Sequence, residues 1–210
     1  MSVRELARRS EVSPSHVSQV ERGLASFSVR TLYNVASVLG LSMDTLFDDA
    51  PSTALDRAVA GGSQDRGIEA GSARSGTDDP LAANGTVLRV GSRPTIPLAG
   101  GTQWERLTAR PESGAEFIEV VYPPVAPNGT RPKDFIQHSS REYGLVMSGT
   151  LTVQIGFELT QLRAGDSVVF DSVVPHRFWN ETPDEVRAVW FIRDLPTSAA
   201  DASEDQDPNA

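Results

Sequence analysis

The sequence predicts a multidomain α plus β chain, with a small all-helical domain followed by an antiparallel β-barrel. Residues 1–47 carry several helix-start signals and apolar residues at helical spacing, whereas residues 86–193 alternate short apolar runs with turn residues. Residues 48–85 are rich in Gly, Ala, Ser and Asp, and residues 194–210 are acidic. Because neither stretch has enough large apolar residues to repay the entropy of ordering, we expect a disordered linker and a disordered tail.

Two short helices are expected at the N-terminus. Ser2 and Glu5 have the S-x-x-E spacing of a capping box, which favours a helix over residues 2–10. Ser13 followed by Pro14 is a helix cap with proline at the first helical position, and Gly23 ends that helix. Two short helices joined by a tight turn form a helix-turn-helix arrangement.

A third helix follows, with Ser28 as its cap, an apolar face that includes Leu32, and Gly40 as its end. At this point ELARRSEVSPSHVSQVERG, followed by SVRTLYNVASVLGLSMDTLF, resembles the DNA-binding domain of the phage-repressor (Cro/C1, or XRE) family. The resemblance includes the small Ala7 between the two helices and Val17 in the core. It implies a DNA-binding domain over residues 1–47.

Two features depart from that family. The sequence begins too late to contain the family's first helix, so we expect either that the apolar residues Leu6, Leu32 and Leu39 are partly uncovered or that the start site lies further upstream. Glu11 occupies the turn position where the family usually has glycine, and there a positive φ is modestly strained for a residue with a Cβ.

The resemblance implies that the helix from Ser13 to Arg22 lies in the major groove. Ser15, His16 and Gln19 would then face base edges, and Gln can make a bidentate contact with adenine. Phosphate contacts are expected from helix N-termini and arginines, at Ser2, Ser13, Arg22, Ser28 and Arg30. The alternative is a domain that no longer binds DNA and serves as a protein contact.

Roughly ten short strands are expected between residues 86 and 193, beginning with TVLRV and ending with VRAVWFI, and they suggest a β-barrel or jelly roll. Within it, His138, Glu142 and His176 form a set of two imidazoles and one carboxylate. Such a set can hold a divalent metal and leave coordination positions open. With no cysteine in the chain, a metal must be held by His and carboxylate groups.

The same region is similar to the two motifs of the cupin superfamily. His138, Glu142 and Gly149 match the first motif, and the second runs from Gly165 through Pro175 and His176 to Asn180. Ile136 stands where the first His of the first motif belongs, so this chain has three of the family's four ligands. The resemblance implies Fe(II), or less selectively Mn, Ni or Zn. The alternative is a pocket that is empty or holds an organic ligand.

Charge and hydropathy narrow the functional class. The net charge of −9 argues against a nucleic-acid partner, but residues 48–86 and 194–210 contribute all of it, and residues 1–47 carry +1. No run of about 18 apolar residues exists and the N-terminus lacks a secretory core, so we expect a cytoplasmic protein without a membrane partner.

We therefore expect a sequence-specific transcriptional regulator, not an enzyme, whose cupin barrel senses a small-molecule effector or a metal in a pocket formed by His138, Glu142 and His176. Double-stranded DNA with a palindromic operator would be the partner, bound by a homodimer. A mononuclear non-haem iron oxygenase or epoxidase is the alternative from another class, since the hydroxypropylphosphonate epoxidase joins the same two domain types. A metal-free binding module is the third interpretation.

Overall fold

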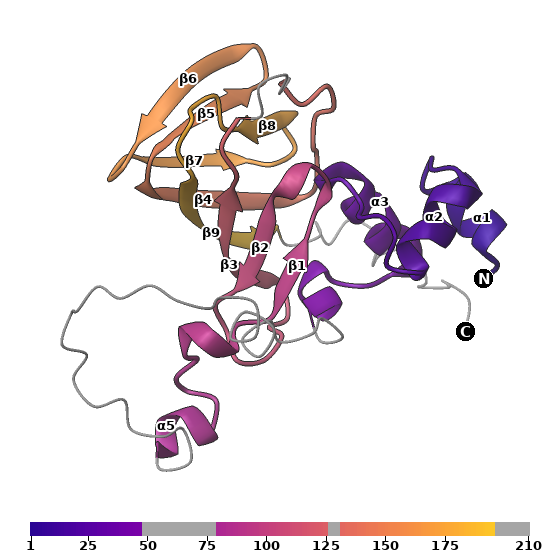
Figure 1. Cartoon of the computed structure of the whole chain (residues 1–210), viewed down its shortest axis with the longest axis horizontal. Coiled ribbons are helices and arrows are strands. Elements are labelled where there is room, and N and C mark those ends of the chain that lie inside the picture. The colour runs from indigo at the N-terminus through magenta and orange to yellow at the C-terminus, as the bar shows by residue number, and fades with distance from the viewer. Residues whose placement is uncertain (48–78, 126–130, 196–210) are drawn as a thin grey trace, which may run out of the picture.

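The computed structural model describes residues 1–47, 79–125 and 131–195, and in Figure 1 the N-terminal helices lie to one side of the strands. Most of the predicted tail and most of the predicted linker lie outside these residues, although Asp194, at the start of the predicted tail, is the last residue of a strand. The end of that linker differs from the expectation, because Asp79 caps a short helix α5 (Pro80–Ala83). The carboxylate of Asp79 accepts the N–H groups of Leu81 and Ala82.

The N-terminal helices follow the expected caps. They are α1 (Val3–Arg9), α2 (Pro14–Glu21), α3 (Val29–Leu39) and the 3₁₀ helix η1 (Met43–Phe47). The hydroxyl of Ser2, Ser13 or Ser28 accepts the backbone N–H three residues later at the start of α1, α2 or α3. Gly40 ends α3 with a φ of 67°. Each cap satisfies one of the amide groups that a helix start leaves without a partner.

The helix-turn-helix packs around Ala7 and Val17, both buried as expected. Glu11 has a φ of 59°, which confirms the strained turn between α1 and α2. The expectation that Leu32 is uncovered is wrong: its side chain is 8% exposed and belongs to the same apolar core as β-domain residues. The β domain covers this part of α3, while Leu39 remains exposed.

The β domain contains nine strands in the described residues. They are β1 (Thr95–Pro97), β2 (Gln103–Arg106), β3 (Ala115–Tyr122), β4 (Ser140–Ser148), β5 (Thr150–Ile155), β6 (Glu158–Arg163), β7 (Ser167–Asp171), β8 (His176–Trp179) and β9 (Val186–Asp194). All pairs are antiparallel, in a six-stranded sheet ordered β1-β2-β3-β9-β4-β7 and a three-stranded sheet ordered β6-β5-β8.

One expected strand does not form. The TVLRV stretch at 86–90 lies against helix α5, where the N–H of Val87 donates to the carbonyl of Leu81 at 2.8 Å. It then enters the 3₁₀ turn η2 (Val90–Ser92). Its backbone therefore finds a local partner, and alternation of apolar residues alone does not make a strand where no neighbouring strand is available.

The core lies between the two sheets, since it contains Ile118 and Trp190 of the larger sheet together with Leu151 and Val153 of the smaller one. This confirms the jelly-roll architecture. Gly144 of β4 has a specific role here, because a Cβ at that position would lie 2.6 Å from the Trp190 ring. Only glycine lets the indole lie across the strand.

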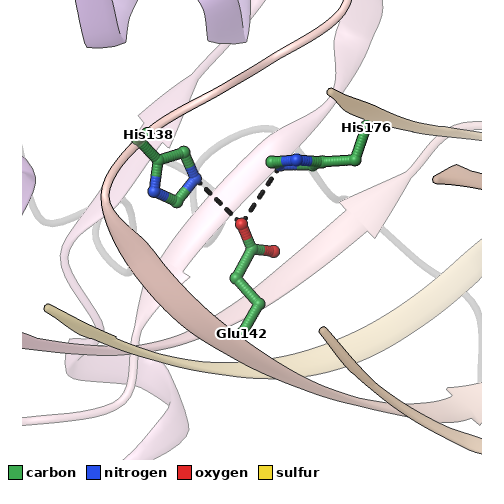
Figure 2. A group of neighbouring side chains, drawn as sticks. All are labelled: His138, Glu142 and His176. Carbon is green, nitrogen blue, oxygen red and sulfur yellow. Dashed lines mark ion pairs between the residues drawn. The ribbon is translucent and has the colours of Figure 1, made fainter. Parts of the chain in front are cut away.

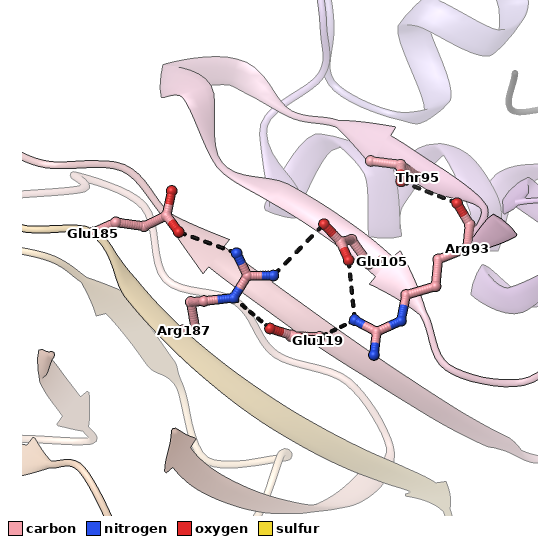
Figure 3. Close-up of polar contacts among 6 residues, drawn as sticks. All are labelled: Arg93, Thr95, Glu105, Glu119, Glu185 and Arg187. Carbon is pink, nitrogen blue, oxygen red and sulfur yellow. Dashed lines mark hydrogen bonds and ion pairs between the residues drawn. The ribbon is translucent and has the colours of Figure 1, made fainter. Parts of the chain in front are cut away.

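The other face of the larger sheet carries a cluster of ion pairs (Figure 3). Glu105 of β2 and Glu119 of β3 stand directly opposite each other. Arg93 reaches Glu119 at 2.6 Å and Glu105 at 3.2 Å, and Arg187 of β9 reaches Glu119 at 2.6 Å. Two guanidinium groups thus offset the repulsion that two facing carboxylates would otherwise produce.

The helical and β domains are in direct contact through α3 and the segment before it (Figure 1). The carbonyl of Phe27 accepts the N–H of Ala99, in the short η3 turn (Ala99–Gly101), at 3.0 Å. The Arg106 guanidinium lies over the ring of Phe47, 5.8 Å from its centroid. Within the described residues, no helix combines the length and hydropathy needed to cross a membrane.

Candidate metal and ligand site

Three separate segments place the predicted triad at one point. Alternation along β4 directs Glu142 inward, and its neighbours Arg141 and Tyr143 lie on the opposite face. His176 begins β8, and His138 lies in the loop before β4, where its backbone N–H donates to the carbonyl of Ser172 at 3.0 Å. The structure therefore brings together all three residues that the sequence selected.

Figure 2 shows both imidazoles directed at the same carboxylate oxygen. The Nε2 atom of His138 lies 2.8 Å from Oε1 of Glu142, and the Nε2 atom of His176 lies 3.1 Å from it. The hydroxyl of Ser172 donates to the same oxygen at 2.9 Å. Glu142 is 3% exposed and His176 is 1% exposed. One ligand atom from each of the three residues lies within 4.8 Å of the others.

The protonation of the two imidazoles decides whether the triad can hold a metal ion. Nδ1 of His176 lies 2.9 Å from the carbonyl of Val174, so in the tautomer that donates this bond Nε2 presents a lone pair to Glu142. Nε2 of His138 is buried and, despite its closeness to Glu142, has no hydrogen bond in the described residues. The Nε2 atoms of both imidazoles and a carboxylate oxygen converge, and when both nitrogens are unprotonated this arrangement fits a divalent cation.

The electrostatics keep the carboxylate ionised. Burial acts to raise the pKa of Glu142, but the imidazoles of His138 and His176 outweigh it and hold that pKa at about 2. An ionised carboxylate is the form that ligates metal. A bound ion would offer open coordination positions to a further ligand. His138, Glu142 and His176 could therefore hold Fe(II) or another divalent metal.

A cavity of about 270 Å³ opens beside the triad. Its walls are mostly apolar and include Trp104, Ile118, Phe178 and Trp190 of the β domain. Ile136, at the position of the absent fourth ligand, also lines it and pairs its backbone with His176 through two hydrogen bonds of 2.8 and 3.0 Å. The substitution thus leaves the strand pairing intact and gives the cavity another apolar wall.

Sequence reasoning missed Tyr33, which lies on α3 and lines the same cavity. Its ring stacks on that of His138, with centroids 4.4 Å apart and 10° between the planes. Burial, with the charges of Glu116, Glu142 and Asp194, raises the pKa of Tyr33, so the phenol stays protonated. Nothing in the sequence links two residues that are 105 positions apart.

The predicted base-reading residues lie on α2, away from the β domain (Figure 1). Ser15 and Gln19 are exposed, in keeping with a role in contacting DNA. His16 is half-buried, and its ring contacts that of Phe27 edge to face at 5.6 Å. His16 therefore also serves the packing of the domain.

The predicted phosphate-contacting residues divide into two groups. Ser2, Ser13 and Ser28 cap helix N-termini, as described above. The Arg22 side chain donates to the carbonyl of Ser18 at 3.0 Å, and Arg30 points to the β domain, where it pairs with Asp134 at 3.2 Å. Arg30 also lines the cavity, so the structure gives it a partner other than phosphate.

Comparison with known proteins supports both domain types. A helix-turn-helix family model matches residues 1–46, and a cupin domain model matches residues 124–192. Together they span more than half of the chain. The HTH-type transcriptional regulator PuuR of Escherichia coli (strain K12) is 25% identical over 189 residues, which cover 90% of this chain and 85% of that protein.

Two solved structures extend the comparison. An HTH_3 family transcriptional regulator from Vibrio cholerae has a TM-score of 0.55 at 20% identity, covering 94% of this chain and 88% of that one. Hydroxypropylphosphonic acid epoxidase from S. wedmorenis has a TM-score of 0.42 at 19% identity, covering 92% and 89%, which is too distant to bear on activity. The two matched domains and the regulator relatives identify the chain as a DNA-binding transcriptional regulator of the XRE helix-turn-helix type with a C-terminal cupin domain.

Proposed function

We propose that this regulator senses a divalent metal, a small molecule or both in its β-domain cavity, and that occupancy changes its affinity for DNA. One observation carries the proposal: the His138, Glu142 and His176 triad opens into a cavity whose wall includes helix α3 of the DNA-binding domain. A ligand that binds two arrangements of the domains unequally shifts the population toward one of them. The regulator would act in the cytoplasm and has no catalytic role in this proposal.

On the DNA side, α2 enters the major groove with exposed Ser15 and Gln19 at base edges, and His16 at the edge of the contact. The N-termini of the helices capped by Ser2 and Ser13 present amide groups to phosphates, whereas Ser28 lines the cavity beside the β domain. These phosphate contacts fix the position of the domain on the DNA, and the α2 side chains determine which base sequence it prefers.

A homodimer on a palindromic operator completes the proposal. One small helix-turn-helix domain makes too few DNA contacts for specific binding, and a second domain on a paired half-site supplies the additional contacts. The outward face of the larger sheet supports pairing, because exposed apolar side chains from neighbouring strands adjoin there. They are Phe117, Tyr143, Leu145, Val169 and Phe191. Phe191 contacts Phe117 and Tyr143 at 6.4 and 6.1 Å between centroids. A second copy would cover this strip.

The test is a selection of DNA sequences by the full-length protein, with and without Co(II), followed by measurement of the Kd for the selected site. We expect a palindromic preference whose Kd changes on metal loading. Gln19→Ala should weaken binding to the selected site by roughly tenfold or more. Ser37→Ala, on the exposed side of α3, is the matched control. Absence of any sequence preference would refute the proposal.

A second candidate function is an iron-dependent oxygenase, favoured by one observation: the triad leaves coordination positions open beside an apolar cavity. It predicts that anaerobically reconstituted protein retains Fe(II) and consumes O2 with a substrate. Iron content that is the same in His176→Ala as in wild type would refute it. Iron retention without O2 consumption would instead favour a sensor.

A further inference from the structure

Helix α3 belongs to the DNA-binding domain, yet one side of it forms part of the cavity wall. Ser28, Val29, Arg30 and Tyr33 line the cavity together with β-domain residues. Leu32 and Ala36 of the same helix are buried in the apolar core that continues into the β domain. The cavity is therefore a site between two domains, and any ligand in it contacts both.

Tyr33 connects α3 directly to the triad. Besides stacking on His138 at 4.4 Å, it meets the edge of Trp104 with centroids 6.0 Å apart and 69° between the rings. His138 in turn contacts His176 at 5.4 Å between centroids. A continuous set of ring contacts thus connects the triad to α3, a helix of the DNA-binding domain that packs against α1.

The other contacts across the boundary are of two kinds. Leu32, Ala36, Met43 and Phe47 are buried in the core shared with the β domain, but none of them lines the cavity. Arg30 does line the cavity and pairs with Asp134 at 3.2 Å, but both of these side chains are exposed to solvent. Exposed ion pairs contribute little to the position of a helix. Stacked aromatic rings in a buried setting contribute more, so Tyr33 is well placed to respond to what the cavity holds.

We infer that Tyr33 is the residue through which occupancy of the cavity reaches the DNA-binding domain, and that the cavity takes a small anion with an apolar body that binds the metal. This inference rests on the proposed sensor function. Metal binding holds the His138 ring in one orientation, and an anion in the open coordination positions occupies space next to Tyr33. Metal binding or anion binding therefore changes the β-domain surface against which Tyr33 of α3 packs.

The ligand class follows from the lining. Apolar walls at Ile118 and Phe178 favour an apolar body, while Arg30, Lys133 and Arg177 outnumber the acidic Asp134 and Glu142. A divalent ion at the triad adds further positive charge. Tyr122 and Trp190 also line the cavity, and burial raises the pKa of Tyr122, so its phenol stays protonated and can donate a hydrogen bond. Donors, cations and a metal together favour an anionic acceptor such as a carboxylate.

The first experiment measures coupling in the full-length protein, with Co(II) alone as the probe. Co(II) affinity is read from visible absorption, and DNA affinity from fluorescence anisotropy on the selected site. We expect metal to change the wild-type Kd for DNA by about fivefold or more, and DNA to change the Kd for metal by the same factor. In Tyr33→Ala we expect both factors to fall below about twofold, with each ligand still bound.

Two variants make the comparison specific. Tyr33→Phe keeps the stacked ring and should retain the wild-type coupling, while Ser37→Ala on the exposed side of the same helix should leave it unchanged. Full coupling in Tyr33→Ala would overturn the inference, as would a wild type that binds metal and DNA without mutual effect. A wild type that takes up no Co(II) would overturn the metal part of the proposed function and this inference with it.

The second experiment tests the ligand class with a pair of molecules of the same shape. Benzoate and benzamide are added in turn to the Co(II)-loaded protein, and the absorption of the metal is followed. We expect benzoate to change the Co(II) spectrum at concentrations at least tenfold below those at which benzamide acts. Equal responses, or a spectrum unchanged by benzoate, would overturn the assignment of an anionic ligand.

Discussion

Two buried glutamates of the β domain, Glu142 in the cavity and Glu119 on the other face of the sheet, are held by pairs of basic side chains. Both have lowered pKa values, in each case because basic partners outweigh the opposing effect of burial. The partners of Glu119 are arginines, which stay charged and carry only donors. The partners of Glu142 are imidazoles, which can be neutral and offer lone pairs. The first cluster is complete by itself, whereas the second can accept a cation.

The largest expected effect is on metal affinity, which should fall when the Glu142 cluster is changed and stay the same when the Glu119 cluster is changed. His176→Ala removes one of three ligands and should weaken Co(II) binding by more than about 100-fold, since loss of an outer-shell partner alone costs roughly 10- to 100-fold. Arg187→Ala, which truncates the other cluster, is the matched control and should leave the Kd within about twofold. Metal titration followed by absorption decides the matter. Equal losses in the two variants would mean that the clusters do not differ in this way.

The free energy of unfolding should depend on the Glu119 cluster, in contrast to metal affinity, which depends on the Glu142 cluster. Glu119→Ala leaves Arg93 and Arg187 with Glu105 as the one carboxylate that they share in a partly buried site, and we expect a loss of about 2 kcal/mol in the free energy of unfolding. The figure is below that of a fully buried pair because the Arg187 side chain is 35% exposed. Urea denaturation followed by tryptophan fluorescence measures it. Glu158→Ala, at an exposed position of β6, should change the value by less than about 0.5 kcal/mol.

A smaller effect is expected at Ser172, whose hydroxyl donates to Glu142 at 2.9 Å. Ser172→Ala should weaken Co(II) binding by roughly tenfold, because the carboxylate loses the bond that orients it. Ser167→Ala, an exposed serine on β7, provides the control. Unchanged metal affinity in Ser172→Ala would show that the two imidazoles alone position Glu142.

The smallest expected effect concerns pH. The pKa of Glu119 is lowered from its ordinary value of 4.5: burial opposes the shift, and the bonds from Arg187 and Arg93 outweigh it. Its contribution to stability is therefore fully present above pH 4.5 and is lost as pH falls through the lowered value. The difference in unfolding free energy between wild type and Glu119→Gln should be constant from about pH 8 to pH 5.5 and shrink below pH 4.5. A difference that grows on acidification would contradict this.

Local signals in the sequence predicted the helical domain well. Capping serines, Pro14 and Gly40 act within a few residues of their own position, so α1, α2 and α3 begin and end close to where the sequence indicates. The strand pattern was less reliable. Alternation at 86–90 predicted a strand, but pairing requires a neighbour, and the backbone there bonded to α5 instead.

The sequence by itself determined the two domain types, the strained turn at Glu11 and the membership of the triad, because each depends on local spacing or on residue chemistry. Only the tertiary structure decided that Leu32 is covered by the β domain, that Arg30 pairs with Asp134, and that Tyr33 lies on His138. Those contacts join residues about a hundred positions apart. Their geometry depends on how two folded domains meet, and no local pattern encodes that.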